Sequence, residues 1–336
     1  IELRFYSSPS NLLFDCDVLI ITSKFANENH WWFAPKKIEM FKFFEKAKHN
    51  VNHLIWADLS DGTGTTHYET LPYVDRYLKG SVLKNRKNYQ KFLYGSRYVS
   101  DYYHDKFGIE DDDPGEPHLN RHPDDSEIHK IYVSWNSALY NYSYCGCLWR
   151  KLNNRVKCLP MIYLKDWTSP EKNRPNLISC RINTKYNRNT ISFQRCQVLD
   201  HLKGKIQKGR LTLKKYFNEL KNSRVGISPF GAGEICYRDY ETIICGATLM
   251  KPDCNHMETW PNLYIKNKTY ISFKWDFSDF DYIIDTLPDR QNELIEIAQE
   301  AQNLYYNLLF TEEGRCSFCK RFSYLVSFDE ESYCAK

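Results

Sequence analysis

The chain has 336 residues, which is enough for two domains of ordinary size, and 42% hydrophobic with 26% charged residues is typical of a globular protein. Its formal net charge of +4 is too small for a strongly basic binding face, so we expect no nucleic-acid partner. No apolar run approaches the roughly 20 residues of a membrane-spanning helix, so we expect no span.

The first third of the chain alternates between strand and helix patterns. Residues 18–21 form a short apolar run that predicts a buried strand. Residues 36–49 place apolar side chains at helical spacing among Lys and Glu, as in an amphipathic helix. Residues 53–56 predict a second strand, which a polar loop with a glycine follows. This order predicts a βαβ unit of a parallel sheet.

Two segments without periodicity interrupt the pattern. Residues 109–126 are acidic, contain Pro and Gly, and predict a surface loop without chemistry. Residues 166–176 contain two prolines and mixed charge, and predict a linker between domains. We therefore predict an N-terminal domain over 1–168, a C-terminal domain over 169–310, and a final segment, 311–336, that packs back toward the N-terminal domain.

The same alternation returns after the linker. Strands are predicted at 177–181, 225–228, 247–250 and 262–265, and helices at 211–222, 236–245 and 291–309. Two βα halves joined by a Pro-containing linker predict an α/β protein of doubly wound architecture. Such sheets bind ligands at the carboxyl ends of their strands, here in the cleft between the halves.

The stretch 224–253 is the most informative for function. A predicted strand leads into a loop, Ser228-Pro-Phe-Gly-Ala-Gly-Glu234, and a helix follows at once. Gly231 and Gly233 lack side chains, so the backbone can approach a ligand closely. The free amide groups and the dipole at the start of the helix favour a phosphate. The stretch therefore predicts a phosphate-binding loop.

Three charged side chains accompany this loop. Arg238, in the first turns of the helix, can make a bidentate contact to a diphosphate. Glu241 lies one turn further on, where a carboxylate would repel phosphate but can accept hydrogen bonds from both hydroxyls of a ribose. Glu234 closes the loop itself. The alternative is an ordinary β-loop-α unit in which all three are solvated charges.

The segment resembles the donor-site motif of GT-B glycosyltransferases, and is most similar to the exostosin-like branch and related microbial and large-DNA-virus polysaccharide transferases. In that branch a polar loop leads into an Arg, two aromatic-type positions, an acid and an Ala/Cys-Gly pair before an apolar strand. Here the corresponding run is Arg238-Asp-Tyr-Glu241-Thr-Ile-Ile-Cys-Gly246-Ala. The rest of the chain resembles the family only in architecture.

The resemblance implies the GT-B fold, with two Rossmann-like, doubly wound domains that face a central cleft and a C-terminal helix that crosses back to the N-terminal domain. It implies that Glu241 binds the ribose and Arg238 the diphosphate of a nucleotide sugar, with UDP favoured over GDP. We expect Gly231, Gly233 and Glu234 to complete the donor site.

The loop over 181–195 would face the cleft in the GT-B layout. Arg181 and Lys185 are therefore candidates for a further phosphate contact, with Arg188 and Arg195 beside them. For each of these residues alone, a surface or structural role is the alternative.

An inverting transfer needs one base to take the proton of the acceptor hydroxyl. In GT-B relatives this base is an Asp, Glu or His of the N-terminal half, and the loop after the 53–56 strand offers Asp61 and Asp58. Asp61 lies beside a glycine at the end of a buried strand, where catalytic side chains tend to lie. His67 and Asp75 are in reserve, and any of these residues could instead cap a turn.

Retaining GT-B enzymes resemble the segment as well, but their two glutamates are usually one residue further apart than Glu234 and Glu241. The inverting mechanism is therefore favoured. Asp253, His256 and Glu258 follow a strand and could hold a metal, but the relatives imply no metal and we expect no cofactor.

The twelve cysteines show one CxxC pair, Cys316 and Cys319, without the second pair of a structural zinc site. Counting alone leaves a disulfide open. The start of the chain has no signal-peptide layout. We expect a cytoplasmic protein, or one in the host-cell cytoplasm if the source is a virus; a chain that begins at Ile1 also leaves room for a trimmed leader or anchor.

Together these features predict a hexosyl- or pentosyltransferase that moves a sugar from a nucleotide-diphosphate sugar to a glycan acceptor hydroxyl. A retaining transferase, a nucleotide-sugar epimerase of similar fold and a non-catalytic carbohydrate-binding protein are the alternatives. A Rossmann dehydrogenase is disfavoured, because no GxGxxG follows an N-terminal strand.

Overall fold

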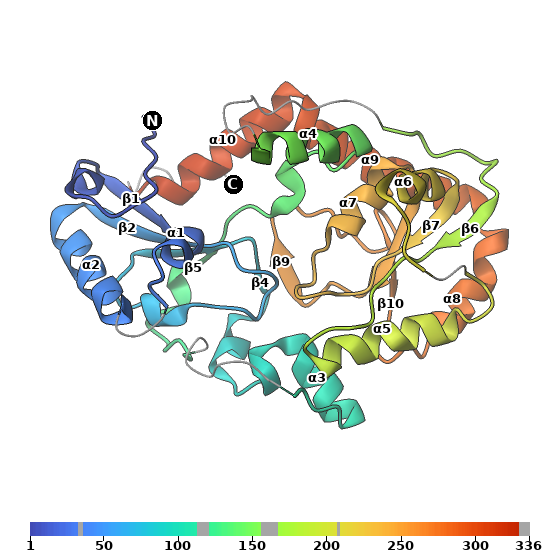
Figure 1. Ribbon diagram of the computed structural model, residues 1–336, viewed down its shortest axis with the longest axis horizontal. Helices are drawn as coiled ribbons and strands as arrows, with labels where there is room; N and C mark the ends of the chain where they lie inside the picture. The colour runs from blue at the N-terminus through green and yellow to red at the C-terminus, as the bar shows by residue number, and fades with distance from the viewer. Residues whose placement is uncertain (33–35, 113–120, 156–166, 207–208, 329–336) are drawn as a thin grey trace.

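A computed structural model describes residues 1–32, 36–112, 121–155, 167–206 and 209–328. Two four-stranded parallel sheets form its framework (Figure 1). The first sheet has the order β1-β2-β3-β5 and contains β1 (Val18–Thr22), β2 (His53–Asp58), β3 (Arg76–Lys79) and β5 (Ile131–Val133). The second has the order β10-β8-β7-β6 and contains β6 (Asn176–Ser179), β7 (Ser223–Ile227), β8 (Thr248–Pro252) and β10 (Ile271–Phe273).

Helices follow the strands in both halves. They are α1 (Ser23–Glu28), α2 (Lys36–Asn50), α3 (Tyr98–Phe107), α4 (Tyr144–Arg155), α5 (Asn189–His201), α6 (Leu213–Lys221), α7 (Tyr237–Ile244), α8 (Phe280–Thr286), α9 (Gln291–Phe310) and α10 (Glu312–Val326). Parallel strands alternating with helices confirm the predicted α/β class with two Rossmann-like halves. Within each sheet the described strands succeed one another in a single direction, so the order does not reverse among them.

Helices cover both faces of the second sheet. Val225 and Ile227 of β7 pack in one cluster with Val198 of α5. Gly226, which points to the other face, lies so close to α7 that a Cβ atom there would be 2.6 Å from the Thr242 side chain. The alternation of side chains along a strand therefore places α5 and α7 on opposite faces of this sheet.

The first sheet is covered in the same way, but one of its helices comes from the end of the chain. Leu54 and Trp56 of β2 pack in a cluster with Phe44 of α2. Ile55, on the other face, packs in a cluster with Leu325 of α10. The C-terminal helix thus crosses back to the first half, as the fold class implies (Figure 1).

Conversely, a helix of the first half, α3, packs against the second half. Tyr103 of α3 is fully buried in the core cluster of the second half, where its hydroxyl accepts a hydrogen bond from Gln194 of α5 at 3.0 Å. The same hydroxyl donates to the carbonyl of Trp275 at 3.1 Å. α3 consequently lies beside α5 in Figure 1.

A two-stranded antiparallel ribbon connects the halves directly. β4 (Ser81–Leu83) pairs with β9 (Met257–Thr259), so that Ser81 lies opposite Thr259 and Leu83 opposite Met257. The side chain of Asn136 supports the ribbon by donating to Thr259 Oγ1 at 2.8 Å. Main-chain pairing therefore joins the two halves directly.

The predicted strand at 262–265 is wrong, and β10 takes its place in the sheet. Two of the backbone N–H groups that a strand there would pair instead donate to side-chain oxygens. Asn262 Oδ1 accepts from Tyr264 N at 3.0 Å, and Thr269 Oγ1 accepts from Ile265 N at 2.8 Å. Such local side-chain bonds compete with sheet ladders.

The acidic stretch is only in part a surface loop. Asp111 is buried, and its carboxylate accepts from Thr190 N at 2.8 Å at the start of α5. Residues 113–120 of this stretch and 329–336 of the predicted C-terminal segment lie outside the described residues. So does most of the region just before the predicted domain boundary at 168/169, and that boundary stays a prediction.

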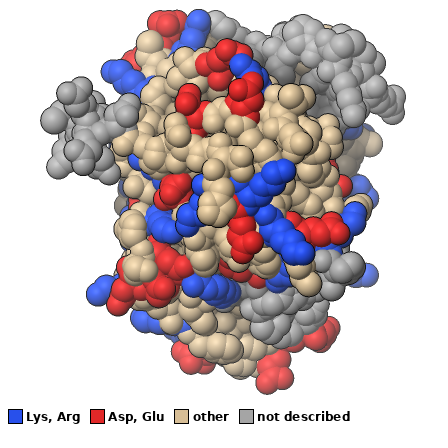
Figure 2. All heavy atoms as spheres, turned by 90° about the vertical axis from the view of Figure 1, so that its left-hand side faces the viewer, with Lys and Arg blue, Asp and Glu red and all other residues tan. Residues whose placement is uncertain are grey.

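The surface of the first half carries mixed charge on the face that Figure 2 shows, where acidic and basic side chains are interspersed. Within the described part of the chain, every helix is too short or too polar to cross a lipid bilayer.

Candidate functional site

The loop between β7 and α7 lies at the carboxyl end of the second sheet and meets the first half. A close backbone approach requires one of its two glycines, and the other lies in a tight side-chain contact. A Cβ atom at Gly233 would lie 2.5 Å from the backbone nitrogen of Gly62, in the loop after β2. A Cβ atom at Gly231 would lie 3.3 Å from a guanidinium nitrogen of Arg195. The glycine loop therefore forms the seam between the halves.

A buried ion pair fixes this loop to the start of α7. Asp239 caps the helix by accepting from Cys236 N at 3.1 Å, and it also accepts from the Ser228 hydroxyl at 2.5 Å. Lys251 donates to the same carboxylate at 2.6 Å and Tyr264 at 2.8 Å. Both charged side chains are fully buried. This network could not be predicted from local patterns, because Asp239 and Lys251 come from different elements.

Arg238 and Glu241 stand one turn apart on α7, as predicted from their spacing. Tyr216 of α6 donates to Glu241 Oε2 at 2.9 Å. Arg238 Nη2 donates to the carbonyl of Arg181 at 2.9 Å, while its buried Nε has no hydrogen-bond partner among the described residues. Burial, followed by the charge of Glu241, raises the pKa of Tyr216 well above its usual range, so this hydroxyl stays a donor.

A hollow of about 580 Å³ opens beside Tyr216, between α4 and the start of α6. It is lined by Lys151, Arg210, Leu211, Thr212, Leu213 and Tyr216. Its volume falls within the range of small-molecule sites. Through Tyr216 it adjoins Glu241.

Among the described residues, no hydrogen bond or ion pair joins the side chains of the two basic candidates of the 181–195 loop to the glycine loop. Arg181 forms a fork with Glu219, with Nε 2.9 Å from Oε1 and 3.0 Å from Oε2, so its charge is already neutralised. Lys185 is exposed, and its backbone nitrogen is bound to Asn183 Oδ1 at 3.1 Å in a turn. Their contact to phosphate stays a prediction.

Two other arginines do reach the glycine loop. Arg195 is buried and donates from Nε to the carbonyl of Phe230 at 2.8 Å. Arg97, from the chain between β4 and α3, donates to the carbonyl of Ala232 and, at 2.6 Å, to Thr65 Oγ1. Arg97 was not among the predicted residues, because nothing in its own sequence neighbourhood marks it.

Glu234 links the two halves. It is buried, and it accepts from Thr63 N at 2.9 Å and from Thr63 Oγ1 at 2.6 Å. His256 Nε2 lies 3.3 Å from Glu234 Oε1, the oxygen that also accepts from Thr63 Oγ1. Burial alone would disfavour the charge, but His256 and Thr63 together lower the pKa of Glu234 to about 2.

The cavity between the facing loops is small, about 20 Å³. It is lined by Gly62, Gly64, Arg97, Val99, Ser100, Ile191 and Phe230–Glu234. A volume of this size holds about one water molecule. A larger ligand at this seam requires the two loops to separate.

Asp58 is buried in a network below the first-half loop. Its carboxylate accepts from the Tyr77 hydroxyl and, at 3.2 Å, from Lys79 Nζ. His67 Nδ1 lies 3.4 Å from Asp58 Oδ1, and the His67 ring stacks on Trp32 with centroids 4.4 Å apart. Although burial opposes it, Lys79 with His67 and Tyr77 hold the pKa of Asp58 far below its usual range.

Asp61 differs from Asp58 in being exposed. It lies directly at the seam, because a Cβ atom at Gly233 would be 3.0 Å from the Asp61 carbonyl carbon. Asp75, one of the reserves, instead accepts from Leu54 N at 2.8 Å and so supports a strand end. Of the two acids predicted as the base, Asp61 is therefore the accessible one.

The possible metal ligands in the second half take separate partners. Asp253 lies 3.5 Å from Lys266, and Glu258 forms a 2.7 Å ion pair with Arg86. Within the described ranges there is no group of three or more His, Cys, Asp or Glu side chains placed to hold a metal ion. The ten described cysteines are free, with Cys316 and Cys319 exposed on α10.

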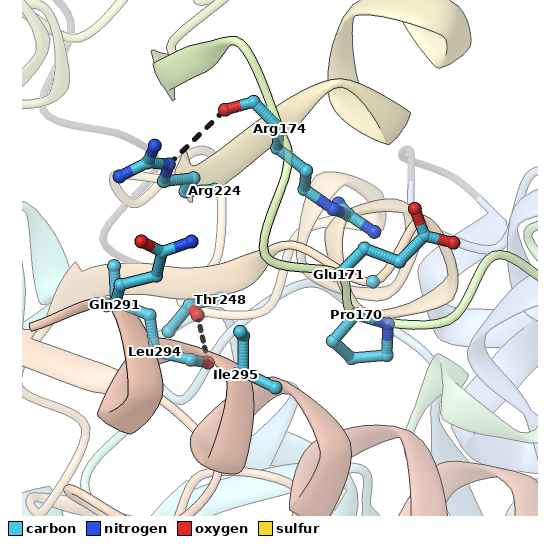
Figure 3. Close-up of a pocket in the computed structure, with 9 residues that line it drawn as sticks. Pro170, Glu171, Arg174, Arg224, Thr248, Gln291, Leu294 and Ile295 are labelled. Atoms are coloured by element: carbon cyan, nitrogen blue, oxygen red, sulfur yellow. Dashed lines mark hydrogen bonds between the residues drawn. The ribbon is translucent and has the colours of Figure 1, made fainter.

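A further cavity, of about 10 Å³, lies at the opposite edge of the second sheet, near the amino ends of β7 and β8 (Figure 3). Arg174 lies over it and donates to the carbonyls of Ser223 at 3.0 Å and Ser169 at 2.8 Å. These bonds satisfy backbone acceptors of the surrounding loops, so Arg174 has a structural role there.

Comparisons with known proteins find no matching protein-family model and no matching curated protein. Among solved structures, an alpha-glucosyltransferase in complex with UDP-glucose and DNA containing an abasic site has 10% identity and a TM-score of 0.41, over 94% of this chain and 82% of its own. Anabaena HepE in complex with UDP has 9% identity and a TM-score of 0.40, over 88% and 75%. TarM has 9% identity and a TM-score of 0.41, over 92% and 54%. Similarity at this level assigns neither a family nor an activity.

Proposed function

We propose that this protein is a glycosyltransferase that moves a sugar from a nucleotide-diphosphate sugar to a hydroxyl group of a glycan acceptor. The observation that carries the proposal is the arrangement on α7, where Arg238 and Glu241 stand one turn apart beside the glycine loop. The arginine suits a diphosphate and the glutamate, held by Tyr216, suits a ribose. UDP is the favoured nucleotide and GDP the alternative.

The donor would lie along the carboxyl edge of the second sheet. Its diphosphate would contact the 229–234 loop, the amino end of α7 and Arg238, which together stabilise the negative charge of the leaving group without a metal or other cofactor. The ribose hydroxyls would donate to Glu241. The nucleobase would then enter the hollow beside Tyr216, whose volume is ample for it.

The acceptor would approach from the first half, with Asp61 as the base. As its hydroxyl oxygen attacks the anomeric carbon, the proton passes to the Asp61 carboxylate, and the bond from that carbon to the diphosphate oxygen breaks. This single displacement inverts the anomeric configuration. Asp58 is less suited to the task, since Lys79 already holds its carboxylate in a buried pair.

His67 is a second candidate base, and the geometry of the Asp58–His67 pair favours it. A carboxylate beside Nδ1 can orient an imidazole so that Nε2 accepts a proton, which is a recurring arrangement in enzymes. The long 3.4 Å contact would have to shorten when the acceptor binds.

The test is the thermal stability of the purified protein with a panel of nucleotides and nucleotide sugars in EDTA. A ligand at 100 times its dissociation constant adds about 2.7 kcal/mol, which is readily seen as a rise in melting temperature. We expect one UDP or GDP compound to stabilise the protein, and Glu241→Gln to abolish the effect. Glu258→Gln, which removes an acid paired with Arg86 away from α7, is the matched control and should leave the effect intact.

If no nucleotide binds with or without EDTA, the donor site is wrong. Binding of glycans alone would then indicate a non-catalytic carbohydrate-binding protein. Turnover of a bound nucleotide sugar without an acceptor would indicate an epimerase, and a product of retained configuration would contradict the inverting mechanism.

A further inference from the structure

Arg97 touches both of the loops that meet at the seam. It follows a short 3-10 turn over Tyr94–Ser96 and immediately precedes α3, the helix that the first half contributes to the second. One guanidinium nitrogen donates to the carbonyl of Ala232 in the glycine loop, and the other to Thr65 Oγ1 in the loop after β2. It therefore lies at the point where the predicted donor and acceptor sides come together.

The glycines around Arg97 make room for it. A Cβ atom at Gly64 would lie 2.7 Å from Arg97 Cα and 2.8 Å from its Cγ. The Arg97 side chain also lines the 20 Å³ cavity, together with Gly231 and Gly233. Backbone from both halves thus closes around one guanidinium group.

The charge of Arg97 is not matched by a carboxylate. Among the described residues no Asp or Glu oxygen forms an ion pair with it, and both of its hydrogen-bond acceptors are neutral. Arg188, the charged neighbour that acts on it most strongly, is also an arginine, and Arg188 has its own partner in Asp111 at 3.6 Å. Burial, and then Arg188, lower the pKa of Arg97 to about 10, against the weaker opposing effect of Glu234, Asp61 and Asp111.

Arg97 is half-buried and hydrogen-bonds only to neutral acceptors, so its guanidinium group can still take a charged partner. An unpaired arginine beside a glycine loop, a helix start and a second arginine therefore marks a place for an anion. Arg97 remains protonated at neutral pH. If it exchanges the neutral carbonyl for a phosphate group that accepts two hydrogen bonds, it gains a charge-assisted contact.

We propose that Arg97 binds the diphosphate of the donor, so that the first half supplies a cation to a group otherwise held by the second half. This inference rests on the proposed function. Binding requires Arg97 to leave the carbonyl of Ala232 as the loops separate, and to close again over the diphosphate. Charge grows on the diphosphate as the sugar departs, so Arg97 contributes more to kcat than to donor affinity.

The test uses inorganic pyrophosphate and UDP as probes, with binding measured by titration calorimetry on the full chain. Arg97→Gln should weaken pyrophosphate binding by about 10- to 100-fold, the range expected for a lost hydrogen bond to a charged group. Arg97→Lys keeps the charge but loses the two-pronged geometry, and should give an intermediate loss.

Arg86→Gln is the matched control. Arg86 also joins the halves, through its 2.7 Å ion pair with Glu258, but it does not contact the glycine loop. We expect this variant to bind pyrophosphate as the wild type does. Melting temperatures of all the variants separate a loss of the fold from a loss of the anion site, and the folded Arg97→Lys protein keeps the test decisive if Arg97→Gln unfolds.

Pyrophosphate binding of wild-type strength in folded Arg97→Gln or Arg97→Lys would overturn the inference. If that result comes with nucleotide binding that depends on Glu241, only the role of Arg97 fails and the proposed function stands. If the wild type binds neither pyrophosphate nor any nucleotide diphosphate, both fail together. An equal loss in Arg86→Gln would also overturn the inference, because the effect would then reflect loosening of the two halves.

Discussion

The loops that face each other across the seam are built on the same plan. In the first half, Asp58 is buried with Lys79 at 3.2 Å and accepts from the hydroxyl of Tyr77. In the second half, Asp239 is buried with Lys251 at 2.6 Å and accepts from the hydroxyl of Tyr264. Each loop is therefore anchored by an Asp–Lys ion pair and a tyrosine, and in both cases the lysine lies near the carboxyl end of a parallel strand.

The loops differ in what they present to the seam. The glycine loop of the second half offers backbone carbonyls to Arg195 and Arg97, and a helix start to whatever binds there. The first-half loop offers an exposed carboxylate, Asp61. Equivalent anchors thus hold a glycine loop with a helix start on one side and an exposed acidic group on the other. We expect the anchors to contribute stability, and the residues that project beyond them to carry the proposed chemistry.

The largest effect should come from the acidic side. Asp61→Asn should lower kcat by about 100- to 10,000-fold, the usual contribution of a general base. The affinity for the donor nucleotide should stay unchanged, since Asp61 is not part of the donor site. Steady-state kinetics with donor and acceptor, together with nucleotide titration, measure both quantities.

His67→Gln sharpens this experiment. If His67 rather than Asp61 is the base, the loss appears in His67→Gln and Asp61→Asn remains nearly as active as the wild type. That result would assign the chemistry of the first half to the Asp58–His67 pair, and the anchor of this loop would then also be catalytic.

The anchors themselves can be broken one at a time. Lys79→Met leaves Asp58 as a buried, uncompensated charge, and Lys251→Met does the same to Asp239. Each variant should lose about 3–5 kcal/mol of unfolding free energy in urea denaturation. Lys37→Met, which removes a partly exposed 2.8 Å pair with Glu69, should lose less than about 1 kcal/mol. A small loss in only one of the buried variants would show that the two loops are not anchored alike.

Removing the contact that Glu234 makes between the loops should give the smallest of these effects on the unfolding free energy. This effect depends on pH. Glu234 has a pKa of about 2 in the folded protein against an ordinary value of 4.5, so the folded state favours its ionised form. Its contribution is fully present above pH 4.5 and is lost as the pH falls toward 2. By linkage it amounts to about 3 kcal/mol at neutral pH.

Glu234→Gln removes this titrating group. Between pH 4.5 and 2 the unfolding free energy of the variant should therefore fall less steeply than that of the wild type. Urea denaturation at several pH values measures the two slopes. Parallel slopes would mean that the contact between Glu234 and Thr63 does not stabilise the ionised carboxylate.

Local patterns in the sequence were sufficient for several elements. The helix predicted over 236–245 is α7, and the strand before it is β7, because apolar spacing and the flanking glycines act over a few residues. The strand at 262–265 failed for the opposite reason, since Thr269 captures a backbone donor from four residues away. Apolar content alone could not reveal that bond.

Some features of the candidate site were likewise predictable from the sequence and others were not. Arg238 and Glu241 were predicted from their spacing, and the structure does place them one turn apart, although their roles remain predictions. The difference between Asp58 and Asp61 was not predictable, because it depends on Lys79, which reaches Asp58 only through the pairing of β2 with β3.

Neighbouring residues along the chain were enough to specify the alternation of strands and helices, the two α/β halves and the glycine loop with its charged helix. The tertiary structure decided which charges are neutralised and which remain available. It paired Arg181 with Glu219, whereas Arg97 forms no ion pair among the described residues and donates to a backbone carbonyl at the seam. Ion pairs form between residues far apart in the chain, and their energies depend on distance and burial, which only the folded protein defines.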